Sequence, residues 1–244
     1  QVPDRNGKIF YTSITSLSYI SKQPRHELKH EITYGDYLAL RRRLLPVMQH
    51  DPHVGQDGLY RVHSLYFDNH NDKILREKLD GKAEREKFRI RYYNNDLDHI
   101  QLEKKYKNHG LGVKYNAPMT ADQVRALLRG DTAWMAESPH GLIRELYVKM
   151  KTETLRPRTT VDYVREPFLY GPGNVRVTFD SQIESAGANE NFLEPHAAIP
   201  AARGKIVLEI KYDRYLPALV AGLLDLGNFR AAAFSKYAIC RMVY

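Results

Sequence analysis

Residues 86–93 read EKFRIRYY, and this stretch decides the fold. Lys87, Arg89 and Arg91 alternate there with apolar and aromatic residues. Successive side chains of a β-strand point to opposite faces of a sheet, so the alternation predicts a strand with one cationic face and one apolar face. The apolar face needs a core to cover it, and the cations gather on the other side.

The same alternation recurs along the chain on both sides of this stretch. Nearly every segment carries Arg or Lys together with a carboxylate on one face, whereas an ordinary solvated face would contain more Ser, Thr, Asn and Gln. The expected strands are RHELKHEI (25–32), LYRVHSLYFD (59–68), EKFRIRYY (86–93), IQLEKKYK (100–107), TTVDYVRE (159–166), NVRVTFD (174–180) and KIVLEIKYD (205–213).

Helix signals lie between the strands. Thr120 and Gln123 form a capping-box pattern, and Gly130 is a suitable stop. The expected helices cover about 33–45, 68–79, 120–130, 139–151, 214–226 and 235–242. Residues 1–24 are weakly patterned and are expected to form an N-terminal arm. No Pro/Gly/Ser-rich linker divides the remainder, so 25–244 is predicted to be one domain.

The composition points to an anionic partner. The 244 residues include 37 Lys or Arg and 29 Asp or Glu, a formal net charge of +8. The single cysteine, Cys240, is expected in the core, cannot form an intrachain disulfide and fits a reducing compartment. No apolar run approaches the roughly 20 residues that span a bilayer. We therefore expect a cytoplasmic protein, with any membrane or transporter association made through a partner or through a segment outside this sequence.

The charged faces are expected to point inward. For a single strand, the ordinary interpretation is a polar face toward water. Recurrence in at least five strands favours a closed antiparallel barrel, with helices packed on its outside and a polar lumen. The predicted fold class is therefore α+β, a closed antiparallel β-tunnel. Most of the 17 tyrosines are expected to pack on the outside of the barrel, beneath the helices.

A cationic lumen of this kind suits phosphate. Arg offers a planar fork that binds phosphate oxygens bidentately, and Lys adds a point charge. Carboxylates would repel phosphate, but a Mg²⁺ or Mn²⁺ ion that bridges carboxylate and phosphate oxygens removes the conflict. The residues alone therefore predict a metal-bound triphosphate or polyphosphate as the ligand.

The ordered motifs resemble a known domain. RHELKHEI, VHSLYFDN, REKLDGKAEREKFRIRYYN, LEKKYK, VREPF, VTFD, VLEIKYD and FSKY together resemble the polyphosphate polymerase domain of the VTC (vacuolar transporter chaperone) family. That domain is similar to the triphosphate tunnel metalloenzymes, which are related to the CYTH group of adenylyl cyclases and thiamine triphosphatases. The resemblance runs from about residue 25 to 242. It implies transfer of the terminal phosphoryl group of ATP to polyphosphate, release of ADP, and Mn²⁺ or Mg²⁺ as cofactor.

The resemblance also implies roles for individual residues. The catalytic set is Lys29, Arg89, Arg91 and Lys236. Further phosphate or nucleotide contacts are expected from Lys78, Lys105, Lys114, Arg165, Arg176, Lys211 and Ser235, and Glu209 is expected to hold the metal. The roles of Glu27 and Glu103 stay open, since either could bind metal or orient Arg and Lys side chains.

Three other functions compete with this prediction. Hydrolases of inorganic triphosphate usually carry an acidic ExExK strand, whereas here Lys29 lies between Glu27 and Glu31, which favours chain binding. A non-enzymatic polyphosphate-binding subunit would have lost catalytic residues, but Glu209 and Lys236 are present. No nucleic-acid partner is expected, because no RNA- or DNA-binding module is visible and a narrow tunnel would exclude a duplex.

Overall fold

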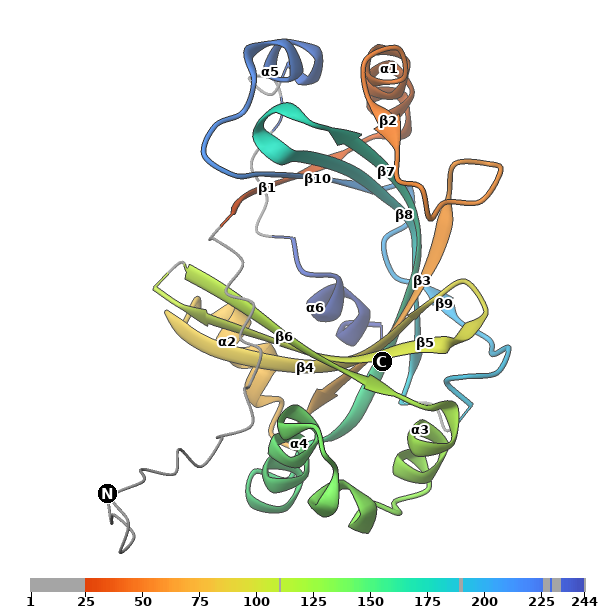
Figure 1. Ribbon diagram of the computed structural model, residues 1–244, viewed down its shortest axis with the longest axis vertical. Helices are drawn as coiled ribbons and strands as arrows, with labels where there is room; N and C mark the ends of the chain where they lie inside the picture. The colour runs from red at the N-terminus through yellow and green to blue at the C-terminus, as the bar shows by residue number, and fades with distance from the viewer. Residues whose placement is uncertain (1–24, 110, 189–190, 226–228, 230–233, 244) are drawn as a thin grey trace, which may run out of the picture.

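A single curled sheet organises the molecule. The computed structural model describes residues 25–109, 111–188, 191–225, 229 and 234–243. The strands pair antiparallel in the order β1-β10-β8-β7-β3-β4-β5-β6, with β2 beside β7 and β9 beside β8. Figure 1 shows the sheet curling around a central space, with most helices outside it. The predicted α+β fold, an antiparallel β-tunnel with helices packed outside, is confirmed in the form of a curled antiparallel sheet.

Each predicted segment coincides with a strand, but β5, β7 and β8 run several residues beyond the predicted bounds. The strands are β1 (His26–Ile32), β2 (Gln49–His50), β3 (Tyr60–Asp68), β4 (Glu84–Tyr93), β5 (Asp96–Asn108), β6 (Leu111–Met119), β7 (Arg156–Tyr170), β8 (Val175–Gly187), β9 (Ile199–Pro200) and β10 (Ile206–Tyr212).

The two ends of the sheet, β1 and β6, have no ladder between them in the part of the chain that the structure describes. A side-chain contact links the two sides of the opening instead: Lys105 Nζ on β5, the strand next to β6, lies 3.1 Å from Glu27 Oε2 on β1. The ladders therefore form a half-barrel, and a long cationic side chain spans the gap that hydrogen bonds would fill in a closed tunnel.

Three of the described helices begin at a residue whose side chain caps the helix. The helices are α1 (Tyr34–Leu44), α2 (Lys73–Leu79), α3 (Ala121–Leu128), α4 (Gly141–Thr152), α5 (Ala218–Leu224) and α6 (Lys236–Arg241), with 3₁₀ turns η1 (Ala133–Glu137) and η2 (Pro172–Asn174). Thr120 and Gln123 make the predicted reciprocal capping box at α3. The second helix begins later than expected, because the Asp68 carboxylate accepts hydrogen bonds from the backbone N–H groups of Ile74 and Leu75.

Much of the core lies between the convex face of the sheet and the outer helices. Phe88 and Ile90, the apolar partners of the arginines in EKFRIRYY, are fully buried. They belong to one cluster with Val124 of α3 and Ile143 of α4. Burial of each such side chain stabilises the fold by about 1.5–3 kcal/mol. Because this burial fixes the orientation of β4, the opposite face of the strand points into the curl.

One helix departs from the expectation that helices cover the outside. Figure 1 shows α6 within the curl of the sheet. The Tyr237 ring lies 5.2 Å from the Tyr66 ring, and the Tyr237 hydroxyl donates to Asp68 at 2.5 Å. These contacts hold α6 against β3, on the same side of the sheet as the arginines.

Strand β6 was not expected. It contains Gly112, Asn116 and Pro118, which are disfavoured in strands. An edge position tolerates Pro, whose missing N–H can face away from the neighbouring strand. The expected N-terminal arm, residues 1–24, lies outside the described residues. None of the described helices is both long and apolar enough to cross a membrane.

Candidate functional site

Contacts between strands that are not neighbours show which side chains point into the curl. Arg91 of β4 donates to the Tyr163 hydroxyl of β7 at 3.1 Å, across the intervening β3. Arg176 of β8 donates to the Tyr60 hydroxyl of β3 at 2.8 Å, across β7. We call this side the concave face. From its strands, it carries Glu27, Lys29, Tyr60, Ser64, Tyr66, Lys87, Arg89, Arg91, Tyr93, Glu103, Lys105, Lys114, Tyr163, Arg165, Arg176, Asp180, Glu209 and Lys211.

One cluster surrounds Glu103. Arg89 contacts Glu103 Oε2 through Nε at 2.7 Å and Nη2 at 2.6 Å, and Lys114 Nζ lies 2.5 Å from Oε1. Burial would raise the pKa of Glu103, but Arg89, Arg91 and Lys114 outweigh it and hold that pKa well below its usual range. Glu103 is therefore ionised and orients cations from β4 and β6.

A second cluster surrounds Asp180, which is fully buried. Arg165 donates two hydrogen bonds to its carboxylate, from Nε to Oδ1 at 2.6 Å and from Nη2 to Oδ2 at 2.7 Å. Lys236 Nζ, at the start of α6, lies 2.5 Å from Oδ2. Despite burial, Arg165 and Lys236 lower the pKa of Asp180 to about 2. The carboxylate thus fixes two cations from different elements at one point.

Tyr163 joins the two clusters. Besides accepting a hydrogen bond from Arg91, its ring has Lys236 Nζ at 4.8 Å and the Arg165 guanidinium at 5.3 Å from its centroid. The electron-rich face of an aromatic ring attracts cations at these distances. Three cations from β4, β7 and α6 therefore converge on one buried side chain.

Glu209 lies where β1, β7 and β10 supply cations. Lys211 Nζ is 2.6 Å from its Oε1, while Arg165 and Lys29 are 3.7 and 3.9 Å away. Burial raises the pKa of Glu209, but the neighbouring cations hold it well below its usual range. An ionised, largely buried carboxylate is a suitable ligand for Mg²⁺ or Mn²⁺.

The donor set limits the kind of metal site. Within the described residues, no three His, Cys, Asp or Glu side chains are grouped to hold a metal. Mg²⁺ is commonly bound by one or two carboxylates together with substrate phosphates and water. Glu209 therefore fits a metal that arrives with phosphate oxygens, and does not fit a metal held by protein alone.

Cations exceed carboxylates on the concave face. No ion pair involves Lys87 in the described part of the chain, and its Nζ lies 5.5 Å from the centroid of the Tyr66 ring. Burial and the positive charges of Arg89, Lys105 and Lys29 outweigh Tyr66 and lower the pKa of Lys87 to about 8. Positive charge without a counter-charge destabilises the fold, and a bound anion would neutralise it. The excess therefore indicates an anionic ligand.

The excess of positive charge on the concave face also affects the pKa of Tyr66. Its hydroxyl oxygen accepts a hydrogen bond from Arg89 at 2.8 Å. Burial alone would raise the pKa of Tyr66, but Arg89, Lys87 and Arg91 outweigh it and lower the pKa to about 7. A tyrosine that loses its proton this easily reports a strongly positive potential.

Most of the predicted site residues are brought together on this face. Those on strands are Lys29, Arg89, Arg91, Lys105, Lys114, Arg165, Arg176, Glu209 and Lys211, and α6 adds Lys236. Lys78 of α2 lies near one end of the face, where burial and the charges of Arg85, Lys29 and Lys107 lower its pKa. The Ser235 hydroxyl instead accepts a hydrogen bond from the Ala238 N–H and caps α6. The structure gives these positions, and the chemical roles remain predictions.

Several residues of the concave face were not predicted as site residues. Lys87 lies on the same strand face as Arg89, and Asp180 lies on the same strand face as Arg176. The alternation in the sequence was therefore sufficient to place both residues in the site. Tyr60, Tyr66, Tyr93 and Tyr163 lie on the concave face and are exceptions to the expectation that most tyrosines pack on the outside. Most of their cation contacts come from strands and a helix distant in the chain, which no local pattern specifies.

A family model described as the VTC domain matches residues 24–244. No curated protein sequence gives a significant match. Among solved structures, the PH1819 protein from Pyrococcus horikoshii OT3 is 14% identical, with 89% of this chain and 98% of that chain covered and a TM-score of 0.47. The PH1012 protein of the same organism is 14% identical, with coverages of 84% and 94% and a TM-score of 0.42.

Proposed function

Because this chain belongs to the VTC domain family, we propose that it is a polyphosphate polymerase. It transfers the terminal phosphoryl group of ATP to a growing chain of inorganic polyphosphate and releases ADP. The observation that carries the proposal is the excess of cations over carboxylates along the concave face, which includes Lys87 without an ion-pair partner among the described residues.

The geometry suits an extended phosphate chain. Arg89 and Arg91 are two residues apart on β4, so both forks face the curl and can grip neighbouring phosphates. In the structure, Glu103 holds the Arg89 fork in place. When a phosphate chain enters, its oxygens replace carboxylate oxygens as partners of these cations. The cations therefore have anionic partners both before and after polyphosphate binds.

Lys236 is the proposed contact to the reacting phosphate. Asp180 and the Tyr163 ring position its ammonium group from two sides. Phosphoryl transfer asks for positioning and for stabilisation of charge spread over the transferred group. A fixed ammonium group supplies both without covalent chemistry.

The reaction needs no side-chain nucleophile. A terminal oxygen of the polyphosphate chain forms a bond to the γ-phosphorus of ATP, and the bond from that phosphorus to the β,γ-bridging oxygen breaks. The electron pair leaves on ADP. Mg²⁺ or Mn²⁺ held by Glu209 would neutralise charge on the phosphate oxygens. Trapping of a phosphorylated side chain would contradict direct transfer.

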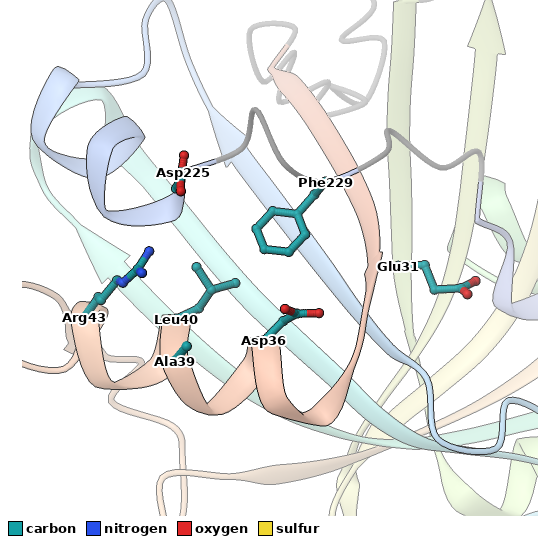
Figure 2. Close-up of a pocket in the computed structure, with 7 residues that line it drawn as sticks. All are labelled: Glu31, Asp36, Ala39, Leu40, Arg43, Asp225 and Phe229. Atoms are coloured by element: carbon teal, nitrogen blue, oxygen red, sulfur yellow. The ribbon is translucent and has the colours of Figure 1, made fainter.

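A hydrolase is the strongest competing function. Tunnel hydrolases usually carry a metal-binding carboxylate at the strand position that Lys29 occupies here. Lys29 Nζ lies 2.6 Å from Glu27 Oε1, and Glu31, drawn in Figure 2 on β1 before the start of α1, pairs with Lys205 at 2.8 Å. This distribution of contacts favours chain binding over metal-assisted hydrolysis.

Variant activity tests the proposal. The purified chain is incubated with ATP and Mn²⁺, and products are sized on a gel. Lys236→Ala and Glu209→Gln should each abolish polymer formation and retain cooperative unfolding. The matched controls Lys151→Ala and Glu137→Gln change exposed residues on the outer α4 and η1 and should form polymer normally. Normal synthesis by Lys236→Ala or Glu209→Gln would refute the assigned site.

A further inference from the structure

The two ends of the concave face differ in chemistry. Strand β4 runs between them, from Arg85 near its start to Tyr93 at its last residue. At about 3.3 Å per residue, these two positions are roughly 26 Å apart. They mark what we call the lysine end, near Arg85, and the tyrosine end, near Tyr93.

The lysine end gathers positive charge. Arg85 of β4 lies opposite Lys107 of β5 in the sheet ladder, and Lys105 is two residues away on the same face of β5. Burial together with Arg85 and Lys105 lowers the pKa of Lys107, and burial together with Arg85, Lys29 and Lys107 lowers that of Lys78. Burial is the larger cause of both shifts, and the neighbouring cations add to it. A row of positive charges of this kind suits a polyanion with regularly repeated negative charges. It provides no group that would select for any other chemical feature of the ligand.

The tyrosine end combines aromatic rings with arginine. The rings of Tyr60 and Tyr93 pack edge to face, with centroids 5.4 Å apart and planes at 86°. Tyr60 is buried and its hydroxyl accepts a hydrogen bond from Arg176, which also pairs with Asp51 at 3.0 Å. Tyr93 is 37% exposed. A buried, hydrogen-bonded ring thus supports an exposed one beside the site.

Contacts lead from Tyr93 to the proposed reaction centre. The Arg91 guanidinium lies 6.0 Å from the Tyr93 ring centroid, and its Nη2 donates to the Tyr163 hydroxyl. The Tyr163 ring in turn faces Lys236. Arg91 and Tyr163 therefore connect Tyr93 to Lys236 through successive contacts.

We propose that Tyr93, supported by Tyr60, is a stacking site for the nucleobase of ATP, and that the polyphosphate chain occupies the lysine end. This inference rests on the proposed function. ATP then binds with its base on Tyr93 and its triphosphate directed past Arg91 toward Lys236. The product grows from Lys236 toward Lys78 and Lys107. Stacking on an aromatic ring accepts any base, so adenine is bound without selection against guanine.

Binding measurements separate the base from the phosphates. Calorimetry is carried out with ADP and with inorganic tripolyphosphate, each with Mg²⁺, on the wild-type chain and on Tyr93→Ala. The variant should bind ADP about tenfold more weakly, in line with the loss of one base-stacking contact, and bind tripolyphosphate as the wild type does. Tyr93→Phe, which keeps the ring, should restore ADP affinity. Tyr34→Ala, at an exposed tyrosine of α1, should change neither.

The opposite end supplies the reciprocal test. Lys107→Ala should weaken binding of long-chain polyphosphate and leave ADP affinity unchanged. An unchanged ratio of ADP to tripolyphosphate affinity in Tyr93→Ala would overturn the base site. Failure of the wild type to bind tripolyphosphate at all would overturn the proposed function itself, so the two failures are distinguishable.

Discussion

Lys236 Nζ lies 2.5 Å from Asp180 Oδ2, and these two side chains are only 13% and 0% exposed. The contact ties α6, which lies within the curl, to β8 of the sheet. It forms in the same cluster as the bidentate Arg165–Asp180 pair. A single carboxylate therefore compensates two buried cations, and the state of this carboxylate affects both stability and the proposed chemistry.

Asp180→Asn should destabilise the chain by about 3 kcal/mol, because it removes the carboxylate closest to the buried Arg165 and Lys236 and leaves Arg165 only the more distant Glu209, at 3.7 Å. Urea unfolding measures this change. Added polyphosphate should raise the Tm of the variant more than that of the wild type, since phosphate replaces the missing charge. Asp122→Asn, which changes an exposed ion pair with Arg125, should alter stability by less than about 1 kcal/mol. Equal polyphosphate-induced shifts in the variant and the wild type would argue against a phosphate site beside Asp180.

The same carboxylate predicts a pH dependence. Its folded pKa of about 2 lies below the unfolded value of about 3.9. Ionised Asp180 therefore stabilises the fold above about pH 4, and this contribution of roughly 2–3 kcal/mol disappears as the pH falls through about 2. Acid unfolding of wild type and Asp180→Asn should show stabilities that converge in this range. Parallel curves would mean that Asp180 is not the group responsible.

Tyr66 should ionise near neutral pH, since its pKa is lowered to about 7. An ultraviolet titration should show one tyrosinate forming around that pH in the wild type and not in Tyr66→Phe. Bound polyphosphate should move the step to higher pH, because its negative charge offsets Arg89 and Lys87. A midpoint that polyphosphate leaves in place would show that the chain does not bind beside Tyr66.

Metal removal should leave the fold unchanged. The Glu209 oxygens already have Lys211 and Arg165 as partners, and the described residues hold no group of three metal-ligating side chains. A chelator should therefore not lower the Tm. Calorimetry should detect strong Mn²⁺ binding only with tripolyphosphate present, and Glu209→Gln should weaken that binding. Tight Mn²⁺ binding by the chain alone would contradict a metal shared with phosphate.

Alternation in the sequence predicted the strands correctly, because odd- and even-numbered residues of a strand point to opposite faces of the sheet. In β4 it correctly separated Arg89 and Arg91 from the buried Phe88 and Ile90. Capping chemistry placed the start of α3 because Thr120 and Gln123 act within one turn.

Long-range contacts were beyond the sequence. Lys236 and Asp180 are distant in the chain, and nothing local shows that α6 folds into the curl. The concave tyrosines escaped prediction for a related reason. Strand β3 is buried on both faces, so the burial of Tyr66 beside Arg89 resembles that of an ordinary core residue. Its contact with a cation from the neighbouring strand is visible only in the folded sheet.

The most direct test of the polymerase claim is ³¹P NMR of the chain with ATP and Mn²⁺. The proposed function predicts internal polyphosphate signals that grow as the γ-phosphate signal of ATP declines, with one ADP formed for each phosphate incorporated. Release of one orthophosphate for each ADP, without polyphosphate signals, would contradict the claim and identify a hydrolase.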